Sequence, residues 1–201
     1  MIKLPVSIHT EYIKQKRLKL YYPVVYGLPN KEAERKINHE IRSAVQQLLM
    51  TQGFYENPLT EVTGHFELKT NEKGVLSLTI INYAYSGGAH GLTRMKGLTF
   101  NTLTGKKYLL SELFLDNSDY VKVLSTMVST QIKERGILLL NPPFKSISPE
   151  QDFYIADKAL VLFYQLYELT AYAFGFPYFP ISVYDVEKLV DPQSPLGKML
   201  S

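Results

Sequence analysis

The sequence contains no cysteine and no tryptophan, and it has no long run of apolar residues. Without cysteine the chain can form no disulfide, no thiol nucleophile and no cysteine-ligated metal site. Leu138-Leu139-Leu140 is the kind of short apolar run that occurs here, and it falls far below the length of a membrane-spanning helix. The sequence therefore predicts no membrane span.

A secretory leader is also missing from the start of the sequence. Met1 to Pro5 leads into alternating apolar and polar residues and not into a continuous apolar segment. If the sequence is the whole protein, the chain is predicted to be cytoplasmic. If it is a fragment of a longer exported protein, an extracytoplasmic location is expected instead. Sequence alone leaves the compartment open between these two readings.

The net charge is low, at +3. The 22 Lys and Arg residues nearly balance the 19 Asp and Glu residues, and only Lys14 to Lys19 forms a basic cluster. A nucleic-acid-binding domain usually concentrates more positive charge on one element. We therefore expect no nucleic-acid partner, and we interpret the basic cluster as a solvated strand edge.

The remaining composition is that of a folded domain, with 201 residues of which 45% are hydrophobic. Alternation with a period of two at the N-terminus, and apolar or β-branched runs bounded by turn residues further on, predict strands at 4–12, 18–25, 62–70, 75–85, 93–101, 107–110, 153–155 and 159–164. Helical periodicity predicts one helix after Asn30, ended near Gly53, and a second at 119–135. The fold class is α+β: an antiparallel sheet with two main packed helices, divided softly into sub-domains 1–58 and 59–201. The last ten residues are expected to be loosely attached.

A glycine-rich connection, Ser86 to Gly91, joins two of the predicted strands. A phosphate-binding loop would require a following helix and a Gly-Lys-Ser/Thr sequence, and neither is present. A serine hydrolase using Ser86 and His90 would require a nucleophile elbow, and Gly-x-Ser-x-Gly is absent. Two readings remain: a recognition loop in which Tyr85, Ser86 and His90 face a ligand, and a structural bend in which His90 caps a backbone carbonyl. The second is favoured.

The segment from Gln165 to Phe179 is rich in aromatic residues and supplies the other ligand-binding candidates, Tyr167, Glu168 and Tyr172. Glu168 follows an apolar strand, so we expect its carboxylate to be partly buried and held by backbone amides or a tyrosine hydroxyl. The spacing of the carboxylates singles out no glycosidase pair, and His9, His39, His65 and His90 show no metal-binding spacing. We therefore assign no catalytic residue, no metal and no cofactor.

Three stretches together carry a family resemblance: Tyr85-Ser86-Gly87-Gly88-Ala89-His90-Gly91, then Phe100 to Lys106 with Leu110-Ser111-Glu112-Leu113-Phe114, and finally Phe163 to Gly175. Over about residues 5–190 the chain resembles a pair of domains of unknown function. This pair occurs in the extracytoplasmic region of lysozyme-sensing anti-sigma-V factors and ahead of the catalytic domain of a peptidoglycan deacetylase. Ala171 stands where the family usually has proline, and the printed sequence includes no anchor, sigma-binding segment or deacetylase domain.

The resemblance implies an α+β fold and a role in binding at the cell envelope, with a lysozyme-like protein or peptidoglycan as partner. The leading hypothesis is thus a non-enzymatic binding module. The alternatives are a small hydrolase acting on glycan or ester substrates through His90, and a cytoplasmic or spore-associated structural protein. The sequence specifies neither the ligand nor the oligomeric state.

Overall fold

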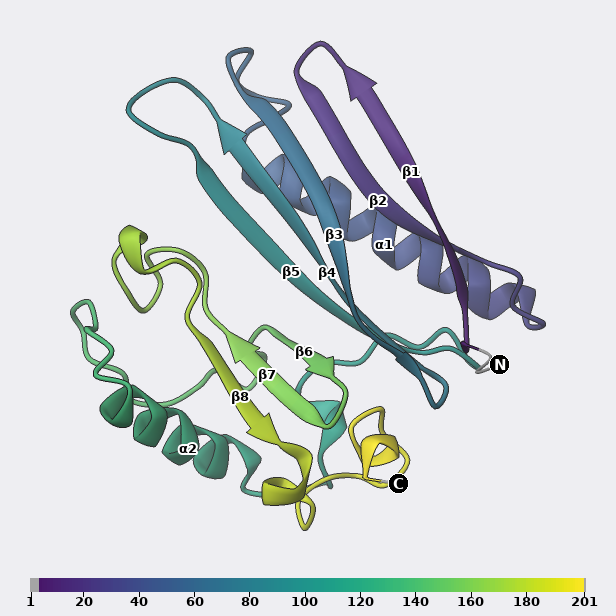
Figure 1. The fold of residues 1–201 in the computed structure, drawn as a ribbon, viewed down its shortest axis with the longest axis vertical. Helices are drawn as coiled ribbons and strands as arrows, with labels where there is room; N and C mark the ends of the chain where they lie inside the picture. The colour runs from purple at the N-terminus through teal and green to yellow at the C-terminus, as the bar shows by residue number, and fades with distance from the viewer. Residues whose placement is uncertain (1–3, 201) are drawn as a thin grey trace. The chain divides into compact units, whose positions relative to one another are not determined.

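The computed structural model describes residues 4–200, so Met1 to Lys3, where a leader would begin, lie outside the described residues. By its internal contacts the chain falls into two compact units, which divide between Lys107 and Tyr108. The first, unit 1, holds a five-stranded sheet and one long helix; the second, unit 2, holds a three-stranded sheet and a shorter helix (Figure 1). Both units are α+β, and the predicted fold class is confirmed.

The sheet of unit 1 has the strand order β1-β2-β3-β4-β5. Its strands are β1 (Ser7–Gln15), β2 (Leu18–Tyr26), β3 (Glu61–Glu72), β4 (Val75–Tyr85) and β5 (Leu92–Asn101). All neighbours pair antiparallel except β2 and β3, which pair in parallel over three residue pairs starting at Leu18 and Val62. The exception follows from the connection, because a parallel pair requires a long crossover and helix α1 (Lys31–Thr51) provides it.

This pairing groups the chain differently from the boundary expected between residues 58 and 59. β2 lies before that point and β3 after it, yet the two strands belong to one sheet, and unit 1 continues to Lys107. Local sequence patterns identify strands but do not show which strands pair. For this reason the sequence alone predicts residues 1–58 as a separate sub-domain.

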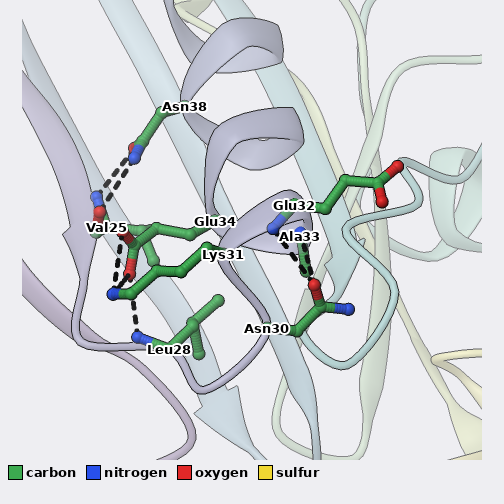
Figure 2. A network of polar contacts seen from close by, with 8 residues as sticks. All are labelled: Val25, Leu28, Asn30, Lys31, Glu32, Ala33, Glu34 and Asn38. Carbon is green, nitrogen blue, oxygen red and sulfur yellow. Dashed lines mark hydrogen bonds and ion pairs between the residues drawn. The ribbon is translucent and has the colours of Figure 1, made fainter.

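Helix α1 begins and ends as its sequence predicts. The Asn30 side chain accepts hydrogen bonds from the amides of Glu32 and Ala33 at 3.1 and 3.2 Å (Figure 2). At the other end Gly53 has a φ of 72°, and its amide and that of Phe54 donate to carbonyls of the last turn. The buried face consists of Ala33, Ile37, Ile41, Ala44, Val45, Leu48 and Leu49.

Asn38 fixes this helix against β2. Its side chain accepts from the amide of Val25 and donates to the carbonyl of Val25, both at 2.8 Å (Figure 2). β3 pairs with β2 only at Leu18 to Leu20, so the polar groups of Val25 have no strand on that side. The amide of Asn38 supplies both missing partners and satisfies the backbone there.

The core of unit 1 lies between α1 and one face of the sheet (Figure 1). Leu76, Leu78 and Ile80 of β4 are fully buried in it, together with Ile37 and Ile41 of the helix. β4 is buried at every position from Val75 to Ile80 and then alternates between buried and exposed positions as it approaches Tyr85. The strand is therefore core along its first half and open to solvent on one face at its end.

Unit 2 has the antiparallel strand order β6-β7-β8, with strands Phe153–Ala156, Ala159–Phe163 and Tyr178–Ser182 and helix α2 (Tyr120–Glu134). Four short 3-10 turns complete the described elements: η1 (Ser111–Leu113), η2 (Tyr172–Phe174), η3 (Val183–Val186) and η4 (Gly197–Met199). A tight turn joins the first two of these strands, with Asp157 at a φ of 48°.

Two sequence predictions in this region are wrong. The strand expected at 107–110 does not form, because Lys107 makes only an isolated bridge with Phe100 before the chain enters unit 2. The tail is not loosely attached: Leu196 and Met199 are fully buried, and the Ser194 hydroxyl donates to the carbonyl of Leu113 at 3.0 Å. Partners this far apart in sequence are invisible to local periodicity.

Candidate functional site

The glycine-rich connection between β4 and β5 is held by its own side chains. Gly87 and Gly88 take φ values of 90° and 100°, which allow the reversal without strain. The Tyr85 hydroxyl donates to the carbonyl of Gly88 at 2.9 Å. Residues 85 to 90 are exposed. The structural bend predicted from the sequence is therefore present, with the ring of Tyr85 folded back along the loop.

Ser86 and His90 each bond to a group that restrains the loop. The Ser86 hydroxyl bonds to the hydroxyl of Thr60, a fully buried residue, at 2.8 Å. The His90 Nδ1 lies 2.9 Å from the carbonyl of Gly91, a contact that requires the proton on Nδ1 because a carbonyl only accepts. A threonine hydroxyl is no base, so the contact of Ser86 with Thr60 supports a structural role.

The other three candidates lie in unit 2, in the turn that leads into η2. The Glu168 carboxylate accepts from the amide of Gln165 at 2.7 Å, and the Glu168 amide donates to the carbonyl of Gln165 at 3.1 Å. This reciprocal pair closes a turn in which Tyr167 takes a φ of 67°. The backbone hydrogen bond expected for Glu168 is present. Its side chain is exposed, however, and not partly buried as expected.

Tyr167 and Tyr172 form an aromatic pair above that turn, with ring centroids 5.5 Å apart and the planes inclined by 33°. Tyr167 is exposed, Tyr172 half-buried, and Phe174 at the end of η2 exposed. We call Tyr167, Glu168, Tyr172 and Phe174 the aromatic turn. The structure thus brings Tyr167, Glu168 and Tyr172 together within unit 2, while Tyr85, Ser86 and His90 belong to unit 1.

One buried group beneath the aromatic turn has an altered acidity. Burial raises the pKa of the Tyr164 hydroxyl well above its ordinary value, and the negative charge of Glu168 raises it further. That hydroxyl has no hydrogen-bond partner among the described residues. It therefore stays protonated throughout the physiological range.

The described residues contain neither a metal-binding cluster nor a helix able to cross a membrane. In residues 4–200 no three His, Asp or Glu side chains lie close enough together to hold a metal ion. Within the same range no helix combines the length and the apolar character that crossing a bilayer requires.

Comparison with known proteins assigns the two units. Residues 7–93 match the model described as deacetylase PdaC, and residues 111–184 match the model described as a protein of unknown function, DUF3298. One match lies in each unit. The chain thus matches both models of this domain pair, in the same order. The resemblance stated from the sequence is confirmed, and the PdaC segment contains the glycine-rich loop while the DUF3298 segment contains the aromatic turn.

Proteins similar to this chain occur in several bacteria. The chain is 29% identical over 174 residues to the anti-sigma-V factor RsiV of Bacillus subtilis. The matched region covers 79% of this chain and 60% of that protein. It therefore spans less than two thirds of this relative. A crystal structure of a DUF3298 family member from Bacteroides fragilis has a TM-score of 0.75 at 12% identity, covering 98% of both chains. One from Pseudomonas aeruginosa has a TM-score of 0.68 at 13% identity, covering 95% of this chain and 96% of the other. These two show the fold alone.

Proposed function

We propose that the chain is a non-enzymatic recognition module of the cell envelope and that its partner is a lysozyme-like protein. The domain pair and the anti-sigma-V relative support a binding or sensing role. The partner class follows from the family resemblance. The contact of Ser86 with Thr60 and that of Glu168 with Gln165 each restrain a turn, which suits a binding surface better than a catalytic centre.

The aromatic turn carries the proposal. Tyrosine rings that are held in place offer a partner a large contact area at a low entropic cost, and for this reason tyrosine is enriched at protein interfaces. The reciprocal bonds between Glu168 and Gln165 close the turn, and Tyr167 packs on Tyr172. The exposed Glu168 carboxylate adds a negative charge beside the rings, which favours a partner with a basic surface.

Calorimetry with the full chain tests this function. Hen egg-white lysozyme is titrated into wild type and into Tyr167→Ala, with Tyr184→Ala as the control because the two tyrosines are 51% and 50% exposed in the same unit. We expect binding that weakens about tenfold or more in Tyr167→Ala, the size of an interface anchor, and changes less than about twofold in Tyr184→Ala.

Two outcomes contradict the proposal. Folded wild-type protein that gives no heat with lysozyme has no partner of this class. Binding of peptidoglycan fragments or chito-oligosaccharides without binding of lysozyme makes the glycan the ligand of the module and overturns the protein partner. Circular dichroism of each variant establishes that it is folded before the titration.

The hydrolase alternative rests on His90, and the contact of Ser86 with Thr60 does not favour it. Any glycan or ester hydrolysis detected in purified protein should be measured again in His90→Ala. Activity that survives in this variant excludes the mechanism. The structural-protein alternative predicts that cell fractionation finds the protein in the cytoplasm or the spore.

A further inference from the structure

The face of the unit 1 sheet opposite the helical core carries tyrosines and lysines in register. Leu20 and Ile80 point into the core, so alternation places Tyr21 and Tyr83 on the other face. The strand pairing then aligns two rows across the sheet. One row is Lys14, Lys19, Thr63, Tyr83 and Thr93. Beside it Tyr12 lies opposite Tyr21 on β1 and β2, and His65 lies opposite Ile81 on β3 and β4. We call these residues the lysine–tyrosine face.

Its tyrosines are held in place before any ligand arrives. Tyr12 and Tyr21 lie opposite each other, and their rings stack with centroids 4.4 Å apart and planes inclined by 10°. The hydroxyl of Tyr83 accepts a hydrogen bond from the amide of Gly91 at 3.1 Å. The three rings nevertheless remain 43%, 46% and 39% exposed. Rings that are fixed yet accessible lose little entropy when a ligand stacks on them.

Between the rings the face is hollowed, with a volume of about 470 Å³. Its lining consists of Tyr12, Lys19, Tyr21, Thr63, Gly64, His65, Ile81, Tyr83 and Thr93. The threonine and tyrosine hydroxyls and the imidazole of His65 supply hydrogen-bonding groups in this lining. None of these residues bears a carboxylate, so the hollow contains potential positive charge and no negative charge.

Lys14 and Lys19 increase that positive charge. They are directly opposite each other on neighbouring strands, an arrangement in which like charges destabilise a sheet. The ion pairs found in residues 4–200 include neither of them. A like-charged pair at the rim of a hollow without carboxylates is complementary to an anionic ligand.

We propose that the lysine–tyrosine face binds a carboxylate-bearing oligosaccharide. The apolar faces of the sugar rings stack on Tyr21 and Tyr83, and sugar hydroxyls bond to the threonines and to His65. The carboxylates lie against Lys14 and Lys19. This site is in unit 1 and is separate from the aromatic turn of unit 2, so it stands whether or not a lysozyme-like protein binds there.

The test uses the full chain and three probes in calorimetry at low salt. A hyaluronan tetrasaccharide carries carboxylates, and chitotetraose is a neutral aminosugar oligomer of equal length. An oligothymidylate is also an anion, but it does not offer open sugar-ring faces for stacking on the tyrosines. We expect the hyaluronan tetrasaccharide to bind more tightly than chitotetraose and to weaken as salt is added. Equal binding of the two sugars, binding of neither, or tighter binding of the oligothymidylate overturns the proposal.

Matched charge variants locate the site. In Lys14→Gln/Lys19→Gln the affinity for the hyaluronan tetrasaccharide should fall about tenfold, since each exposed charge contributes a few-fold. Lys16→Gln removes one positive charge from the exposed turn between β1 and β2 and should change the affinity less than about twofold. Because the double substitution removes a repulsive pair, the variant is expected to fold. An affinity that is unchanged in the double variant, or equally reduced in Lys16→Gln, places the ligand elsewhere.

A final variant separates this site from the protein partner. Tyr167→Ala alters the aromatic turn of unit 2 and should leave the affinity for the hyaluronan tetrasaccharide unchanged. A parallel loss of both ligands in Tyr167→Ala contradicts a separate site in unit 1.

Discussion

Gly91 lies directly against the ring of Tyr83. Its amide donates to the Tyr83 hydroxyl at 3.1 Å, and a Cβ at this position would stand 2.5 Å from the ring carbon Cζ and 2.4 Å from the carbonyl oxygen of Ala84. Gly87 and Gly88, by contrast, have open space around them and are required for their positive φ values. Glycines of one loop thus serve two purposes, and the close approach at Gly91 orders an exposed tyrosine.

Gly91→Ala should therefore destabilise the fold. The added methyl group meets backbone and an aromatic ring, neither of which can move without disturbing β4, and overpacking of this kind costs about 1–3 kcal/mol. Denaturant unfolding measures the loss. Ala89→Ser, in the exposed part of the same loop, is the control and should stay within about 0.5 kcal/mol of wild type. A Gly91→Ala protein as stable as wild type would contradict the close packing.

Asn38→Ala should also lower the free energy of unfolding. The substitution removes both partners of the Val25 backbone and leaves its amide and carbonyl unpaired between α1 and β2. We expect a cost of about 1–3 kcal/mol, measured by urea unfolding. Gln47→Ala changes an exposed position on the same helix and is expected to have little effect. Equal stability of the two variants would show that water replaces the Asn38 side chain without cost.

Tyr164→Phe should leave stability at neutral pH unchanged or raise it by up to about 1 kcal/mol, because the hydroxyl that it removes is buried without a partner among the described residues. Above pH 10 the difference in stability between the variant and wild type should increase in favour of the variant. The raised pKa keeps Tyr164 protonated when folded, whereas in the unfolded chain it ionises near its ordinary value of 10.0, so wild type loses stability as pH rises. Thermal unfolding from pH 7 to 11, with Tyr184→Phe as control, checks both the stability at neutral pH and its pH dependence. If the stabilities of wild type and Tyr164→Phe changed in parallel with pH, the predicted pH dependence would be refuted.

The first turn of α1 should give an acid-dependent contribution. Lys31 and the amide of Leu28 bond to the Glu34 carboxylate and lower its pKa below the ordinary value of 4.5. A lowered pKa stabilises the fold above the unfolded value, and the stabilisation is lost as pH falls through the folded pKa. Glu34→Gln should thus be less stable than wild type at pH 7, with the difference shrinking below pH 4.5. Glu56→Gln, at an exposed position, is the control; a difference that stays constant from pH 7 to 3 would mean that the carboxylate charge is not responsible.

Local patterns predicted most of the elements. Asn30 and Gly53 mark the ends of α1 because capping requires only neighbouring backbone groups, and alternation from Val75 to Tyr85 marks β4 in the same way. The candidate residues of the aromatic turn could be chosen for their composition, and the bond between Glu168 and the Gln165 amide also joins close neighbours. That Glu168 is exposed depends on the conformation of Tyr167, which composition does not reveal.

The lysine–tyrosine face shows the opposite case. Lys14, Tyr12, Lys19 and Tyr21 can be seen to alternate in the sequence, where they read as a solvated strand edge. Only strand pairing brings them beside Thr63 and Tyr83, more than forty residues further along the chain.

The sequence by itself determined the fold class, the helix ends and the domain pair, since these depend on propensities, caps and motifs that act over a few residues. The tertiary structure decided the parallel pairing of β2 with β3, the end of unit 1 at Lys107 and the burial of the tail. It also decided that Gly91 supports Tyr83. These features depend on which distant segments bury their apolar faces against each other, a choice made by the packing of the whole unit.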